Sequence, residues 1–461
     1  MFQELGPDAR SLLEAVAFFP QGMNEENVGW LLPTIPDAPN TFDKFCTLSP
    51  TYRSNGFVTM LAPLRDYLRP KDPMSSPLLN TIKECYFTRL SPNYVLPGEP
   101  SFDEPRWIVS EDVNLEYLLD VLTSIDTGSE NIWGACTKFM DHLCGHKPRL
   151  VVFGPKIETL PDGHPSKASC LWILSRLLYS IGNYTEQKRI LTLALNLERE
   201  RGNDPGFALV LSSLADANRP LGLIKEGIQQ AKEASEILER VGNTIHQAAS
   251  LIILASLLLN DEQLDAAEEV ASRAISFPPE KGLQYLVCQG HRILGLVHWD
   301  KGDAEKGIHH LEVTLKIASS LNLRDQLFWV HFHLATVHTQ RGRFDDAHAH
   351  IQRAESWTID QPYLLALALG LRARCLAALD AFEEAKSEAL RALDIFERLG
   401  ATGDAEAARK VIELIDSASA RGRDSDLIAA DKPDDNGKLF EMVCLAAFAN
   451  PSCLGRVTQS E

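Results

Sequence analysis

The sequence lacks the loop GxxxxGK[ST], whose glycines cradle nucleotide phosphates. Its one Gly-Lys pair, Gly437–Lys438, lies in a polar stretch, and the GPK at 154–156 has no second glycine. The GxSxG turn that presents a nucleophilic serine is missing as well. Paired glutamates such as Glu268–Glu269 fall in stretches of helical periodicity, where a solvated helix face is the simpler interpretation. We therefore expect no enzyme, no catalytic residues and no cofactor.

Basic residues are outnumbered. The chain has 45 Lys+Arg against 63 Asp+Glu, a net charge of −18, which is unfavourable for nucleic-acid phosphates and for anionic membrane surfaces. No apolar run reaches the roughly 18 residues that span a bilayer. The start, MFQELGPDARSLLEAVAFFP, lacks the basic region of a secretory signal, and the nine cysteines include no CxxC pair. We expect a cytoplasmic protein that binds neither nucleic acid nor membrane.

A repeat of 40 residues runs through the second half of the chain. Leucine recurs at this interval, followed each time by a small residue: Leu174–Ser175, Leu214–Ala215, Leu254–Ala255, Leu294–Gly295 and Leu334–Ala335. A second small residue follows 20 positions after each leucine, at Ala194, Ala234, Ala274, Thr314 and Ala354. Small residues let two antiparallel helices approach closely while leucine fills the space between them. The pattern predicts helical hairpins, which must stack to cover their apolar faces.

This spacing resembles the tetratricopeptide repeat (TPR), although each unit has 40 residues rather than about 34. The resemblance implies an all-α fold, a TPR-type solenoid of about six hairpins over 166–400. The sixth unit has Arg372 in place of the leucine. Residues 401–418 are predicted to form a capping helix, and the polar tail 419–461 is predicted to be disordered.

Nine of the 13 histidines lie between residues 291 and 350. In the repeat register, His291 and His331 occupy a position that is leucine in other units. His298 and His338, seven residues later, occupy a second such position. A metal needs three or four ligands that converge on one point. We therefore expect packed imidazoles with hydrogen-bond partners and no metal site.

The front end has a different pattern. Residues 1–70 predict three helices, a hairpin at RSNG (53–56) and a fourth helix, which is a winged-helix arrangement. Residues 71–165 predict a helical connector. The acidic charge of the front end disfavours DNA binding. A unit of this size needs most of its apolar side chains in its core. The candidates are Phe18, Phe19, Trp30, Leu31, Leu32 and Phe42. Those left outside the core should form a residual patch that contacts either the helix expected at 75–90 or another chain.

The stretches LGPDARSLLEAVAFFPQGMNEENVGWLLP and FDKFCTLSPTYRSNGFVTMLAPLRDYL, followed by the repeats, resemble fungal NACHT/NB-ARC–TPR proteins of the STAND class. In that family a Met-His-Asp motif senses the bound nucleotide. Met60 matches, but Leu61 and Ala62 stand where His and Asp would be. The resemblance therefore implies the winged-helix and TPR part of a signal-transduction protein without its NTPase domain.

Two functions follow from this resemblance. The first is a non-enzymatic scaffold that binds a peptide or partner domain, acidic in character, in the concave groove of the solenoid. The second is the sensor half of a STAND NTPase, whose nucleotide-binding domain is a partner in cis or in trans. The register of the TPR family implies these groove residues: Trp172, Arg176, Tyr179, Arg219, Asn260, Arg292, Trp299, Trp329, Phe332, Gln340 and Arg374.

Overall fold

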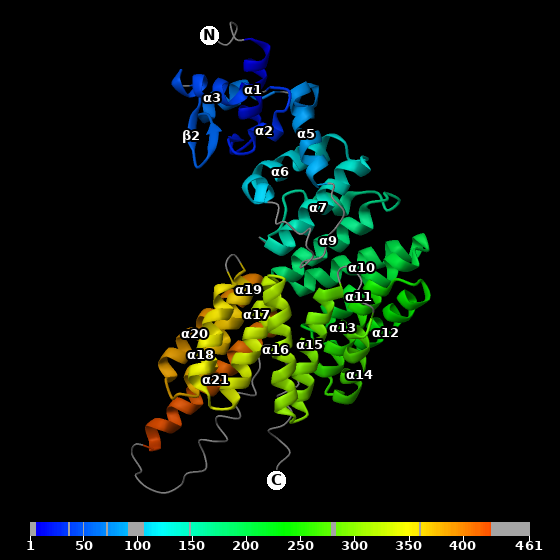
Figure 1. Cartoon of the computed structure of the whole chain (residues 1–461), viewed down its shortest axis with the longest axis vertical. Helices are drawn as coiled ribbons and strands as arrows, with labels where there is room; N and C mark the ends of the chain where they lie inside the picture. The colour runs from blue at the N-terminus through cyan, green and yellow to red at the C-terminus, as the bar shows by residue number, and fades with distance from the viewer. Residues whose placement is uncertain are drawn as a thin grey trace. The chain divides into compact units, whose positions relative to one another are not determined.

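The computed structural model describes residues 6–35, 37–48, 50–70, 72–90, 106–146, 149–277, 283–358 and 361–425 (Figure 1). The described residues form two compact units. One contains those of 1–142 and Leu150–Cys170, and the other those of 143–149 and 171–425. The predicted winged-helix segment and the predicted connector thus belong to one unit.

The front end of the first unit is a small α+β arrangement. Its elements are α1 (Pro7–Phe18), β1 (Met23–Asn24), α2 (Val28–Leu31), α3 (Ala38–Thr47), β2 (Tyr52–Ser54), β3 (Phe57–Thr59) and α4 (Ala62–Leu68). The three strands form an antiparallel sheet in the order β1-β3-β2. Asn55 and Gly56, with φ of 51° and 80°, make the two-residue turn expected at RSNG. The elements follow the predicted order with one extra strand, β1, and the winged-helix assignment stays a prediction.

The core of this unit takes most of the apolar residues singled out at the front end. Phe18, Phe19, Leu31, Leu32 and Phe42 are buried. The sixth, the half-buried Trp30 of α2, faces the connector helices α5 (Pro77–Leu90) and α6 (Arg106–Ile125). The buried rings of Phe18 and Phe19 also contact these helices, at Tyr117 of α6 and Tyr86 of α5.

Trp30 packs edge-on against Tyr86 of α5 and Trp107 of α6, with ring centroids 5.7 and 5.4 Å away. The guanidinium of Arg89 lies 4.1 Å from its ring centroid. The residual apolar patch therefore contacts the connector, which was one of the two expected alternatives.

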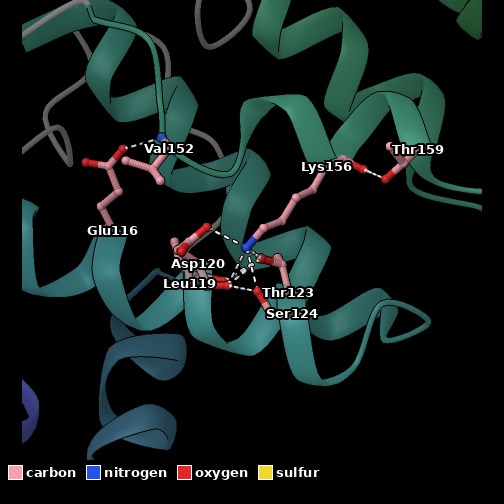
Figure 2. A network of polar contacts seen from close by, with 8 residues as sticks. All are labelled: Glu116, Leu119, Asp120, Thr123, Ser124, Val152, Lys156 and Thr159. Carbon is pink, nitrogen blue, oxygen red and sulfur yellow. Dashed lines mark hydrogen bonds and ion pairs between the residues drawn. The ribbon is translucent and has the colours of Figure 1, made fainter.

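Helices continue through the rest of the connector as η2 (Pro73–Ser75), α7 (Glu130–His146) and α8 (Gly154–Thr159). Two polar networks join α6 to its neighbours. Glu111 of α6 is fully buried and accepts hydrogen bonds from Asn27, Tyr86 and Asn114. Figure 2 shows the second network, in which the Lys156 ammonium of α8 reaches α6 and donates to the carboxylate and carbonyl of Asp120.

The second unit contains the repeats, beginning in α9 (Lys167–Ser180). Six hairpins follow one another: α9 with α10 (Tyr184–Arg201), α11 (Asp204–Asn218) with α12 (Ile224–Arg240), α13 (Thr244–Asn260) with α14 (Leu264–Ile275), α15 (Leu283–Asp300) with α16 (Ala304–Ser320), α17 (Arg324–Gln340) with α18 (Phe344–Ser356), and α19 (Pro362–Ala377) with α20 (Phe382–Leu399). Figure 1 shows them stacked in chain order. The all-α, TPR-like solenoid of six hairpins is confirmed.

Small residues allow the hairpins to close as the repeat predicts. In the fourth hairpin, a Cβ added at Gly307 would lie 3.0 Å from the Gly295 carbonyl oxygen. A Cβ added at Gly227 in the second hairpin would lie 2.9 Å from the Ala215 carbonyl oxygen. The backbones of paired helices therefore nearly touch at these points.

Arg372 replaces the repeat leucine in the sixth hairpin because it has carboxylate partners there. Its guanidinium pairs with Glu355 of the preceding hairpin and lies 3.7 Å from Glu388 of α20. An ion pair thus takes the place of apolar packing between the fifth and sixth hairpins.

The last helix, α21 (Thr402–Ser425), covers the end of the stack. It contributes Ala405, Ala408, Val411 and Ile415 to the core of the last hairpins, as expected of a cap. It runs seven residues beyond the predicted end at 418, so the first part of the predicted disordered tail is helical. The remainder of that tail, 426–461, lies outside the described residues. Among the described helices, none is long and apolar enough to cross a membrane.

Candidate interaction surface

The eleven predicted groove residues all lie on the first helices of the hairpins or directly at their ends. From α11 to α19, each first helix also contacts the first helix of the next hairpin. The first helices therefore form a continuous layer, and the residues in question lie along it.

Side chains on these helices form hydrogen bonds to the next repeat at a spacing of 40 or 41 residues. Trp172 donates to Ser213 at 2.8 Å, Arg219 to the Tyr179 hydroxyl at 3.2 Å, and Trp299 to Gln340 at 2.8 Å. Two further pairs have the same spacing: Tyr285 with Asp325 at 2.6 Å, and Arg292 with His333 at 3.2 Å. We call these five bonds the ladder.

The ladder explains several predicted residues as partners of one another. Tyr179 and Arg219 are bonded together, as are Trp299 and Gln340. Arg292 lies over the ring of Trp329, 5.8 Å from its centroid. These large side chains therefore hold successive hairpins together as well as lining the first-helix layer.

Arg176 and Asn260 stand outside the ladder bonds. The Arg176 guanidinium lies 5.6 Å from the ring centroid of Trp172 on its own helix. Asn260 is half-buried at the end of α13.

Two of the eleven residues are not presented on a surface. Phe332 and Arg374 are each only 3% exposed. Phe332 packs in the core of the last hairpins, where its ring stacks on Phe328 at 5.9 Å. The prediction that these two residues line the groove therefore requires correction. The repeat register predicts on which helix a residue lies, but it does not predict how the curvature of the stack covers that residue.

Contacts that the register did not predict join the first hairpin to the sixth. The ring of Tyr184 lies 5.9 Å from that of Tyr363, and Tyr363 donates to Asp404 of α21 at 3.0 Å. Burial raises the pKa of Asp404 to about 6. Tyr363 and Tyr285 stand at the same point of their repeats, and each has an acidic partner 40 or 41 residues on. This spacing between a tyrosine and an acidic residue is a signal in the sequence that could have predicted the contact of Tyr363 with Asp404.

The histidines form two equivalent clusters in the fourth and fifth hairpins. His291 Nδ1 lies 3.0 Å from His310 Nδ1, and the His298 ring stacks on His310 with centroids 5.3 Å apart. Forty residues later, His331, His338 and His350 repeat the arrangement, with 2.9 Å between the two Nδ1 atoms. These are packed imidazoles with ring partners, as expected. Within the described residues, no group of three or more His, Cys, Asp or Glu side chains is arranged to hold a metal.

No protein-family model matches the chain, and no curated protein matches it. Among solved structures, a Rap protein complexed with competence and sporulation factor is 13% identical over 68% of this chain and 94% of its own, with a TM-score of 0.47. A STAND protein with a tetratricopeptide repeat sensor from Pyrococcus horikoshii is 15% identical over 92% of this chain and 63% of its own, at 0.48. The Rap conjugation gene regulator of the plasmid pLS20, in complex with the Phr* peptide, is 12% identical over 92% and 99%, at 0.45. These values are too low to transfer a function.

Proposed function

We propose that this chain is a non-enzymatic, cytoplasmic scaffold that binds a peptide or a partner domain along the first helices of its solenoid. One observation carries the proposal: the first-helix layer presents a continuous row of aromatic, cationic and amide side chains that keep part of their surface accessible. They are Trp172, Arg176, Tyr179, Arg219, Asn260, Arg292, Trp299, Trp329 and Gln340, all half-buried. Tryptophan, tyrosine and arginine are the residue types that dominate binding energy at interfaces.

The charge of this row favours an acidic partner. The chain as a whole has a net charge of −18, yet the row contains three arginines, one of which, Arg219, pairs with Asp216 of α11. Arginine recognises carboxylates through paired hydrogen bonds, and opposite charge steers the encounter between partners.

A pulldown with a double variant tests this surface. Arg176→Glu with Trp299→Ala reverses a charge and removes a ring on the first helices, and should lose the partners that the wild-type chain captures. Lys232→Glu with Leu193→Ala makes the same two kinds of change at exposed positions of α12 and α10. This control should retain every partner. Retention of all partners by the first variant would exclude the first-helix surface.

The alternative, a sensor half of a STAND NTPase, is favoured by the front end. The helix α4 has no buried residue, and Leu61 and Tyr67 are 66% and 78% exposed. Exposed apolar side chains usually mark a contact, here with a nucleotide-binding domain in cis or in trans. Reading the genomic sequence upstream of Met1 for GxxxxGK[ST] tests it: an open reading frame that joins such a loop to Met1 favours this alternative, and its lack counts against it.

A further inference from the structure

Arg292 differs from Arg219 of the same first-helix layer because its contacts are neutral. Its Nη1 donates to His333 Nε2 at 3.2 Å, and its guanidinium lies over the Trp329 ring. Its Nε is buried and has no hydrogen-bond acceptor. Since Nη1 is taken by His333, the opposite edge of the guanidinium, formed by Nε and Nη2, has no partner in the described part of the chain.

His333 does not supply a counter-charge. Its Nε2 accepts the hydrogen bond from Arg292, so the ring proton resides on Nδ1. Burial, and then the nearby Arg292, lower the pKa of His333 well below its ordinary value. The ring is therefore neutral at physiological pH.

The charged groups around Arg292 also leave it uncompensated. Burial is the main cause that lowers the pKa of Arg292, and the next is the charge of Arg219. The other groups that act on it most are Tyr179, Tyr285 and Cys288, which are neutral at physiological pH. By contrast, Arg219 pairs with Asp216 at 3.2 Å.

A partly buried cation without a counter-ion destabilises a fold, because desolvation is not offset by attraction. Such a group suits a ligand that brings the missing negative charge. The free Nε–Nη2 edge matches a carboxylate, which accepts two parallel hydrogen bonds from a guanidinium.

We propose that Arg292 is the anchor for a carboxylate side chain of an acidic peptide that binds along the first helices. The proposal deepens the proposed function and rests on it. Because Nε is covered in the chain without ligand, the guanidinium has to turn about its last side-chain bonds to present the edge, which releases Nη1 from His333. Trp329 supports the face of the guanidinium.

The first test measures thermal stability of the full chain without ligand. Arg292→Met removes the uncompensated charge and keeps the side-chain length, so the melting temperature should rise by roughly 2–4 °C. Arg219→Met is the matched control, and it should lower the melting temperature because it leaves Asp216 unpaired. A fall with Arg292→Met that equals the fall with Arg219→Met would contradict the inference.

The second test measures binding of a blocked tetraglutamate peptide by calorimetry at constant ionic strength. The wild-type chain should bind it, Arg292→Met should bind at least about tenfold more weakly, and Arg292→Lys should be intermediate because an ammonium cannot form the paired bonds. A tetraglutamine peptide should not bind. Failure of the wild type to bind tetraglutamate, equal binding by Arg292→Met, or equal binding of inorganic phosphate would each overturn the assignment.

The two proposals fail in different ways. If Arg292→Met still captures every partner of the wild type in a pulldown while Arg176→Glu with Trp299→Ala loses them, the first-helix surface stands and the Arg292 anchor is wrong. If both variants retain all partners, the surface itself is wrong.

Discussion

At the scale of single residues, the closest approach in the fourth hairpin depends on two glycines. A Cβ at Gly307 would lie 3.0 Å from the Gly295 carbonyl oxygen and 3.1 Å from the Trp299 amide nitrogen, both backbone atoms that cannot move independently. The fifth hairpin has Ala347 at the equivalent position, so the constraint belongs to the hairpins with glycine there, such as the second with Gly227, and not to the repeat in general.

We expect Gly307→Ala to destabilise the solenoid by about 1–3 kcal/mol, because the new methyl group forces α15 and α16 apart. Gly134→Ala is the control. Gly134 also lies within a helix, α7, but a Cβ there meets nothing within 4 Å. This control should be neutral or stabilising by up to about 1 kcal/mol. Urea unfolding of both variants measures the difference, and an equal effect would contradict the close-approach argument.

The histidine clusters predict how stability depends on pH. Burial is the main cause that lowers the pKa of His310, His331 and His350 to about 4. Between roughly pH 6.5 and 4 the unfolded chain binds more protons at these rings than the folded chain does, so the free energy of unfolding falls as pH decreases through this window. Asp404, with its pKa raised to about 6, acts in the opposite direction, as do Glu111 and Glu355, whose pKa values burial also raises. The histidines whose pKa is lowered outnumber these three carboxyl groups.

The variant His291→Leu with His331→Leu restores the leucine of the earlier repeats and removes one ring from each cluster. We expect its free energy of unfolding to fall less steeply from pH 6.5 to 4 than that of the wild type. His348→Leu is the control, because His348 is exposed on α18. Urea midpoints at several pH values measure the slopes. An unchanged slope in the double variant would show that the clusters do not titrate as described.

At the scale of elements, α21 covers the apolar end of the sixth hairpin, the last one in the described residues. Ala408 is fully buried in the core of the last hairpins, whereas Ser417 on the same helix is exposed. We expect Ala408→Asp to destabilise the solenoid by about 3 kcal/mol or more, since it buries an unpaired carboxylate. Ser417→Asp should have little effect. Thermal unfolding of both variants tests the role of the cap, and equal melting temperatures would exclude it.

The sequence predicted the elements better than it predicted the site. Leucine and small residues at 40-residue spacing were enough to predict six hairpins, because close packing of two helices has few solutions. The strand β1 has two residues, too short for any periodicity. Phe332 was assigned to a surface yet is buried, and Tyr184 and Tyr363 went unnoticed. The burial of Phe332 and the contact between Tyr184 and Tyr363 depend on how strongly the stack curves, and a repeat register does not predict this curvature.

At the scale of the whole molecule, the chain should not respond to nucleotides. No phosphate-binding loop occurs in the sequence, and Leu61 and Ala62 stand where the NACHT/NB-ARC proteins that the front end resembles have His and Asp. We expect ATP and GTP to leave the melting temperature unchanged, because only a ligand of the folded state raises it. Differential scanning fluorimetry with and without Mg²⁺ measures this. A saturable rise would mean that a nucleotide site exists.

The contact between the first and sixth hairpins makes a prediction about coupling along the chain. In an open solenoid each hairpin contacts only its neighbours, so a substitution acts locally. Here Tyr363 lies against Tyr184 and bonds to Asp404, and a Cβ at Gly182 would lie 3.0 Å from the Tyr363 ring. Tyr363 therefore holds together residues of hairpins that are far apart in the sequence.

We expect Tyr363→Ala to accelerate amide hydrogen exchange in α19 and α21 and also around the turn at 180–184 of the first hairpin. Tyr285→Ala is the matched control, because the Tyr285 hydroxyl bonds to side chains of the fourth and fifth hairpins, Asp325 among them. Its effect should stay within those two hairpins, since loss of a local contact opens local structure. Exchange followed by mass spectrometry separates the two patterns. If Tyr363→Ala leaves exchange at 180–184 unchanged, the first and sixth hairpins are not coupled, and the solenoid behaves as an open stack.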